Sequence, residues 1–169
     1  MRSDPTVTCF ALAVCTALAA CAPAETAQSQ GRSAAAAESG AELVALSDAT
    51  ITVYKSPTCG CCGKWVAHLR AAGFNVQVED REDMMAVKEE QGLPPGLTSC
   101  HTAVVDGYVV EGHVPADVVA RMLSERPDVA GITVPGMPIG SPGMEGENPV
   151  PYDVLAFSSD GRTEVYESR

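Results

Sequence analysis

From Thr50 onward, the hydrophobic and polar positions of the chain follow periods typical of strands and of helices. The β-branched run Ile51–Tyr54 predicts a strand, and Trp65, Val66 and Leu69 recur at helical spacing before Gly73 ends the pattern. Strands are expected at 51–54, 75–78, 102–105 and 108–110, and helices at 62–72, 82–91 and 115–125. The segment therefore alternates strands with helices and contains one hairpin.

The order of these elements is strand, helix, strand, helix, hairpin, helix, which is the thioredoxin-like order. We therefore expect an α/β fold with a thioredoxin-like mixed sheet over residues 49–127. Residues 128–169 are expected to add a Gly-, Pro- and Met-rich loop and an extra hairpin, with strands at 154–157 and 163–166 around Asp160-Gly161, packed on the same domain.

The first 48 residues show a different pattern. Residues 1–20 have one early Arg and a short apolar run, as in a signal peptide, and Leu18-Ala19-Ala20-Cys21 resembles the bacterial lipoprotein cleavage box. Residues 21–48 are rich in Ala, Ser, Gln and Glu and predict a flexible tether. We expect a periplasmic protein anchored by lipid on Cys21, with the outer membrane as the favoured location; the alternative is an ordinary signal peptide with a chance cysteine.

The charge of the chain limits its partners. The 169 residues carry 22 acidic and 11 Lys and Arg side chains, for a formal net charge of −11. Nucleic acid is excluded as a partner because its phosphate backbone requires clustered basic side chains. Signal cleavage would remove Cys9 and Cys15 and commit Cys21 to lipid, leaving four of the seven cysteines for chemistry.

Three of these four cysteines lie together in Cys59-Gly60-Cys61-Cys62, directly after a predicted strand and at the start of a helix. A helix N-terminus lowers the pKa of a thiol, and the C-x-x-C spacing of Cys59 and Cys62 permits either a disulfide or chelation. The additional Cys61 suits a polynuclear soft-metal site with bridging thiolates, or a chelating pair with a resolving thiol. Two structural disulfides are the alternative that involves no further chemistry.

The expected topology brings distant ligands to the same edge. If the strand beginning near Thr102 is antiparallel to the first strand, then Cys100 and His101 lie beside Cys59, and the next strand returns His113 to that edge. In thioredoxin-like enzymes a cis-proline usually stands where this chain has Ser99-Cys100-His101. His113 is the favoured nitrogen ligand and His101 a second candidate, whereas His68, with no soft neighbour in sequence, is expected to be structural.

Met137 and Met144 flank the Gly- and Pro-rich loop, where no helical period explains them. Thioether sulfur is a soft ligand that selects Cu(I), so these residues are candidates for an outer metal site. The alternative is that they fill gaps under a loop folded over the domain.

The sequence resembles the CopG-like family of periplasmic metal-binding proteins associated with bacterial copper resistance. The resemblance spans residues 50–169 and is carried by four blocks, Tyr54–Cys62, Ser99–Thr102, Glu111–Pro115 and Pro135–Glu145. It implies copper binding by the cysteines and a role in copper resistance. The residues by themselves indicate only a cluster of soft ligands.

Two functions from different classes are therefore expected. The first is a lipid-tethered protein that sequesters or relays Cu(I), as one or more ions, through Cys59, Cys61, Cys62, Cys100 and a histidine, with copper-handling envelope proteins as partners. Zinc is the less favoured metal. The alternative is an envelope thiol-disulfide oxidoreductase, in which Cys59 attacks and Cys62 resolves. A disulfide-stapled interaction domain has the least support.

Overall fold

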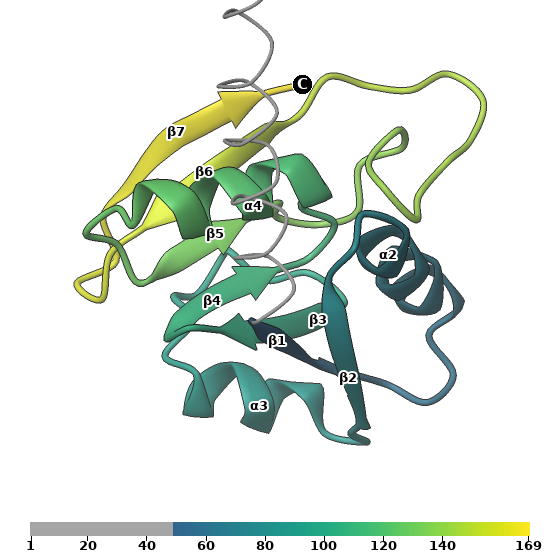
Figure 1. Cartoon of the computed structure of the whole chain (residues 1–169), viewed down its shortest axis with the longest axis horizontal. Helices are drawn as coiled ribbons and strands as arrows, with labels where there is room; N and C mark the ends of the chain where they lie inside the picture. Colours follow the sequence, from purple (N-terminus) through teal and green to yellow (C-terminus); the bar gives the residue numbers. More distant parts are fainter. Residues whose placement is uncertain (1–48) are drawn as a thin grey trace, which may run out of the picture.

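A computed structural model describes residues 49–169 (Figure 1). The expected signal peptide, the lipid-bearing Cys21 and the tether lie outside these residues. Ten elements follow in the order β1 (Thr50–Lys55), α2 (Gly60–Ala71), β2 (Asn75–Asp80), α3 (Met84–Glu90), β3 (His101–Val105), β4 (Tyr108–Glu111), α4 (Ala116–Glu125), β5 (Gly131–Thr133), β6 (Asp153–Phe157) and β7 (Thr163–Ser168). None of the helices in this part of the chain is long and apolar enough to cross a bilayer.

The strands form one mixed sheet in the order β2-β1-β3-β4-β5-β6-β7. Strands β1 and β2 are parallel, whereas β3 is antiparallel to both β1 and β4. The expected α/β class and the pairing of the first four strands are confirmed. The register sets Lys55 opposite His101 and Thr102 opposite Glu111, so the end of β1, the start of β3 and the end of β4 lie at one edge.

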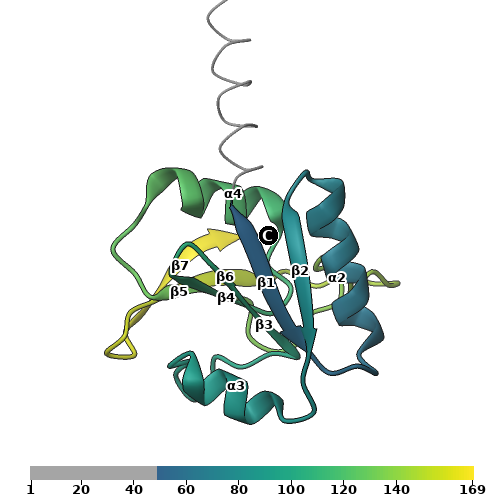
Figure 2. The same ribbon diagram turned by 60° about the horizontal axis from the view of Figure 1, so that its bottom comes forward.

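Helices cover both faces of the sheet, as Figure 2 shows. Apolar side chains of α2 and α4, such as Trp65 and Met122, pack with Val110 in the main core. Helix α3 lies on the opposite face, where its Lys88 reaches Thr102. Since neighbouring residues of a strand point to opposite faces, β3 directs His101 toward α2 and Thr102 toward α3.

The C-terminal extension differs from the expectation in one respect. The chain from Pro127 contains a strand, β5, that the Gly- and Pro-rich pattern did not reveal. This strand pairs in parallel with β4 and antiparallel with β6, so the expected hairpin of β6 and β7 continues the central sheet. A strand of three residues is too short to show an alternating period, which explains why it was missed.

Candidate metal centre

The Cys59–Cys62 segment forms the N-cap and the start of α2, shortly after β1 ends. Cys59 is the N-cap residue of α2, and it forms a disulfide with Cys62. The sequence left disulfide and chelation open for this pair, and the structure shows the disulfide. The expected deprotonated thiolates are therefore absent at these two positions, because a sulfur in a disulfide does not titrate. Cys61 is free, half-buried, and has its Sγ 3.5 Å from that of Cys59.

Cys100 joins this group from the segment that leads into β3. Its Sγ lies 3.5 Å from Cys62 Sγ and 3.8 Å from Cys61 Sγ. The four sulfur atoms of Cys59, Cys61, Cys62 and Cys100 all lie within 4.8 Å of one another. The topology therefore brings together cysteines about forty residues apart, as expected from an antiparallel β3.

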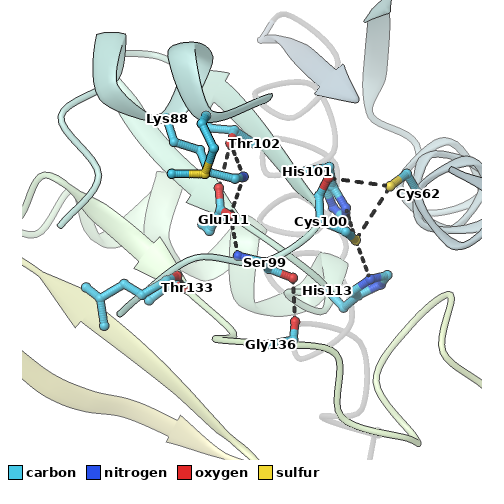
Figure 3. Close-up of polar contacts among 12 residues, drawn as sticks. Cys62, Lys88, Ser99, Cys100, His101, Thr102, Glu111, His113, Thr133 and Gly136 are labelled. Atoms are coloured by element: carbon cyan, nitrogen blue, oxygen red, sulfur yellow. Dashed lines mark hydrogen bonds and ion pairs between the residues drawn. The ribbon is translucent and has the colours of Figure 1, made fainter. Parts of the chain in front are cut away.

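Two histidines also contact Cys100, and Figure 3 shows the Cys100 sulfur between Cys62 and His113. Cys100 Sγ is 3.1 Å from His113 Nε2 and 3.3 Å from His101 Nδ1. These three residues form a second group whose candidate ligand atoms all lie within 4.8 Å of one another. Cys100 thus belongs to both groups and links the sulfur cluster to the imidazoles.

Hydrogen bonding assigns a different role to each imidazole. His113 Nδ1 lies 2.8 Å from the carbonyl oxygen of Pro142, which only accepts, so Nδ1 carries the proton and Nε2 presents its lone pair to Cys100. His101 is fully buried, and its Nε2 has no hydrogen-bond partner. His101 Nδ1 lies 3.3 Å from Cys100 Sγ, and the tautomer of the ring decides which of the two atoms donates. His113 is therefore better oriented as a metal ligand than His101.

Burial favours the uncharged forms of the Cys100 thiol and of the His101 and His113 imidazoles. Desolvation, reinforced by the neighbouring Cys61, raises the pKa of the Cys100 thiol to about 12. Desolvation also lowers the pKa of His101 to about 3 and lowers the pKa of His113, where the Pro142 carbonyl opposes the shift. Two neutral imidazoles beside a thiol suit a metal ion, because the ion can replace the thiol proton between Cys100 Sγ and His113 Nε2.

The donor set fits a soft ion. Once the Cys59–Cys62 disulfide is reduced, the cluster offers four thiol sulfurs, with His113 Nε2 as an oriented nitrogen donor. Thiolate sulfur favours Cu(I) and also binds zinc, whereas carboxylate oxygens, which hard ions prefer, are not part of either group. Ligation by any of these residues stays a prediction.

The loop after β5 covers the centre at His113 and α2. Gly143 has φ +86°, and a Cβ there would lie 2.8 Å from Cys61 O and 2.9 Å from Trp65 N. Only glycine permits this close approach, which brings the neighbouring Pro142 carbonyl within reach of His113. Sequence reasoning took this segment as a candidate for methionine ligands and missed its role in orienting a histidine.

The two candidate methionines have different surroundings. Met144 lines a surface pocket together with Cys61, Lys64 and Glu145, so it shares this pocket with one of the four clustered cysteines. Met137 does not line this pocket and is 52% exposed. The structure therefore brings Met144 near the centre and leaves Met137 on the surface.

His68 has a structural contact, as the sequence suggested. Its Nε2 accepts a hydrogen bond from Ala116 N, the first residue of α4, at 3.0 Å. His68 is also not a member of either group of candidate ligands.

Lys88 and Glu111 were missed by sequence reasoning. They form an ion pair on the α3 face of the sheet, with both side chains buried. Burial raises the pKa of the Glu111 carboxyl against the opposing effect of the Lys88 ammonium. The only signal in the sequence was the position of Glu111 directly before Gly112-His113.

Comparisons with known proteins give one matching family and two similar solved structures. The family described as "Protein of unknown function, DUF411" matches residues 97–144, the segment that contains Cys100, His101 and His113. No curated protein matches the chain. Two solved structures do, both named copper resistance protein CopG. Form 2 is 44% identical, with a TM-score of 0.68, over 72% of this chain and 98% of that chain. Form 1 is 45% identical, with a TM-score of 0.67, over 71% of this chain and 96% of that chain.

The similarity extends over nearly the whole length of both solved chains, and the resemblance seen in the sequence is confirmed. The fold of this chain gathers four cysteines and two histidines in two groups that share Cys100. The chain belongs to the CopG copper resistance protein family.

Proposed function

We propose that this protein binds Cu(I) in the cell envelope, and sequesters or relays it, through Cys59, Cys61, Cys62, Cys100 and His113. The observation that carries this proposal is the approach of four sulfur atoms to within 4.8 Å of one another, with His113 Nε2 3.1 Å from Cys100 Sγ. Sulfur-rich sites select Cu(I), and sulfur atoms this close can bridge more than one ion. The names of the two structural neighbours support copper as the metal.

Copper binding by all four sulfurs is coupled to thiol redox chemistry. Two electrons and two protons convert the Cys59–Cys62 disulfide into two thiols, and an envelope dithiol is the class of donor required. Each thiol then loses its proton to solvent as its sulfur bonds to copper. The oxidised protein retains Cys61 and Cys100 as free thiols, so its site is incomplete.

Location and partners form a further part of the proposal. The lipoprotein cleavage box at Leu18–Cys21 supports a lipid anchor in the periplasm, on the outer membrane, with copper-handling envelope proteins as partners. The thioredoxin-like order of β1 through α4 supports a domain that presents its sulfurs at a helix N-terminus. Met144 lines the pocket beside Cys61, which suits an outer position on the route of an incoming ion.

Metal analysis of the purified protein tests the proposal. The reduced protein is exposed anaerobically to equal amounts of Cu(I) and zinc and desalted, and its metal content is counted. We expect copper to be retained in preference to zinc. Retention of zinc with no copper, or of neither metal, would contradict the proposal.

A second candidate function is thiol-disulfide exchange, which the Cys59–Cys62 disulfide at the start of α2 favours. In this function reduced Cys59 attacks a substrate disulfide, and Cys62 then resolves the mixed disulfide, so that the substrate leaves with two thiols. Insulin reduction measured by turbidity, with the metal-free protein, decides between the two. Activity through Cys59 together with a trapped mixed disulfide in Cys62→Ser supports the second function; background activity with full copper binding supports the first.

A further inference from the structure

A buried ion pair lies on the face of the sheet opposite α2. Lys88 of α3 is 4% exposed and Glu111 of β4 is fully buried, and Lys88 Nζ lies 2.7 Å from Glu111 Oε1. The Thr102 hydroxyl donates to Glu111 Oε2 at 2.6 Å and accepts from Lys88 Nζ at 3.0 Å. This network occupies positions that could hold apolar side chains.

Glu111 also holds the segment that carries Cys100. Its Oε1 accepts a hydrogen bond from the backbone N–H of Ser99 at 2.6 Å, as Figure 3 shows. Ser99 directly precedes Cys100, and Cys100 Sγ belongs to both groups of candidate metal ligands. One carboxylate therefore connects α3, β3 and the backbone beside Cys100.

The backbone around Glu111 is shaped for this contact. Gly112 has φ +74°, and a Cβ there would lie 2.5 Å from the Cβ of Ser99 and 2.7 Å from Val134 O. Hydrogen bonds also hold the segment from its other side: Leu97 O accepts from Thr133 Oγ1, and the Ser99 hydroxyl donates to Gly136 O. The backbone of the segment that leads to Cys100 is thus held by side-chain hydrogen bonds and by the close approach of Gly112 to Ser99.

Stability alone does not account for an ion pair at this place. Removing two charges from water costs free energy that their attraction often fails to recover, so apolar replacements of similar volume are often neutral or stabilising. A carboxylate does supply an acceptor for the Ser99 N–H, which an apolar side chain cannot replace. Lys88 in turn balances the charge of that carboxylate.

We propose that the Lys88–Glu111 pair is the positioning element for Cys100, holding the Ser99 backbone so that Cys100 Sγ lies between the cysteine sulfurs and His113 Nε2. The inference rests on the proposed copper site, which it deepens. It assigns Lys88 and Glu111 as positioning residues, since neither is among the candidate ligands. Partners of this kind around a metal site typically change metal affinity by about 10–100-fold.

Two double variants separate positioning from stability. Lys88→Met with Glu111→Gln removes both charges and keeps an oxygen that accepts from Ser99 N. Lys88→Met with Glu111→Leu removes the charges and the acceptor at similar volume. Cu(I) affinity is measured by competition with a chromophoric chelator. Alkylation of Cys100 in the metal-free, reduced protein is followed by peptide mass spectrometry, and the denaturation midpoint is recorded for each variant.

We expect the Gln variant to match the parent in Cu(I) affinity and in the rate of Cys100 alkylation. We expect the folded Leu variant, in which the Ser99 N–H has lost its acceptor, to bind Cu(I) at least about tenfold more weakly and to alkylate Cys100 faster. Equal copper affinity and equal alkylation in the Leu variant and the parent would overturn the inference, and so would equal losses in both variants. If the parent fails to bind Cu(I), the proposed function fails, and the alkylation contrast still decides the inference.

A measurement on the parent decides the inference if the Leu variant does not fold. Hydrogen exchange by NMR compares the Ser99 amide with the Gly112 amide, which donates to His101 O at 3.0 Å. We expect the Ser99 amide to exchange as slowly as that of Gly112, because it donates its hydrogen bond to the carboxylate of the fully buried Glu111. Rapid exchange of Ser99 beside a protected Gly112 would show that Glu111 does not hold the segment.

Discussion

His113 Nδ1 donates a hydrogen bond to the carbonyl oxygen of Pro142 at 2.8 Å. This bond turns the lone pair of Nε2 toward Cys100 and ties the loop after β5 to the candidate metal centre. The adjacent Gly143 makes the contact possible, because its missing Cβ leaves room against Cys61 and Trp65. The orientation of a ligand thus depends on a residue that has no ligand atom.

Gly143→Ala is therefore expected to displace the loop and weaken copper binding. The new Cβ would meet two backbone atoms of α2, which should cost about 1–3 kcal/mol of stability or lift the loop away from His113. Loss of the Pro142 partner should lower Cu(I) affinity by about 10–100-fold. Chelator competition and denaturant unfolding measure the two effects.

Gly161→Ala is the matched control for this change. Gly161 has φ +83°, close to the +86° of Gly143, but a Cβ there would meet nothing within 4 Å. Both variants carry the cost of a positive φ, so the difference between them reports the contact with α2. Equal effects of the two substitutions would show that the loop does not depend on this close approach.

Copper affinity should depend on pH through Cys100. Its pKa is raised to about 12, so the thiol is protonated between about pH 6 and pH 9 and must release its proton when copper binds. This group alone should therefore increase the apparent affinity about tenfold for each unit by which the pH rises. Competition titrations at several pH values give the slope of log affinity against pH. This slope should be smaller by about one proton in Cys100→Ser than in the parent. Equal slopes in the variant and the parent would contradict this role.

Oxidation should weaken copper binding, since the Cys59–Cys62 disulfide removes two of the four sulfur ligands. We expect the oxidised protein to bind fewer copper ions than the protein treated with a phosphine reductant, and reduction to restore the count. Trp65 is the only tryptophan, and the centre of its ring lies 4.4 Å from that of His101, so its fluorescence is expected to change when copper binds. Identical titrations of the two redox forms would show that this pair is not required.

The residues that carry a periodic pattern were predictable from the sequence. Helix α2 was expected from Trp65, Val66 and Leu69, which are buried, and the hairpin of β3 and β4 from Asp106-Gly107, both at positive φ. The pairing of these strands was enough to bring Cys100 and His113 toward Cys59. Strand order therefore located most of the candidate centre.

What could not be predicted depends on contacts between elements. The C-x-x-C spacing suits a disulfide and chelation equally, so the sequence did not choose between them. Lys88 belongs to a helix with charged faces, and only the packing of α3 on β3 and β4 shows that it is buried with Glu111. The contact between Pro142 and His113 depends on the path of an irregular loop, which has no period to read.

The proposed lipid anchor has its own test. Cys21→Ser should move the protein from the membrane fraction to the soluble fraction, because the lipid is expected on that residue. Fractionation followed by immunoblotting measures the distribution, with Cys15→Ser, inside the expected signal peptide, as the control. A Cys21→Ser variant that stays with the membrane would contradict the lipoprotein prediction.

Cys100 is proposed to complete a Cu(I) site with the three cysteines at the N-terminus of α2, and a Cu(I) titration of the reduced protein against a competing chelator tests this most directly. The parent, Cys100→Ser and His68→Ala are compared for the number of ions bound and their affinity. His68 bonds to Ala116 N and lies outside the cluster, so His68→Ala should bind copper like the parent. Cys100→Ser should bind fewer ions with lower affinity; binding equal to the parent would mean that the site is a local chelate of Cys59, Cys61 and Cys62.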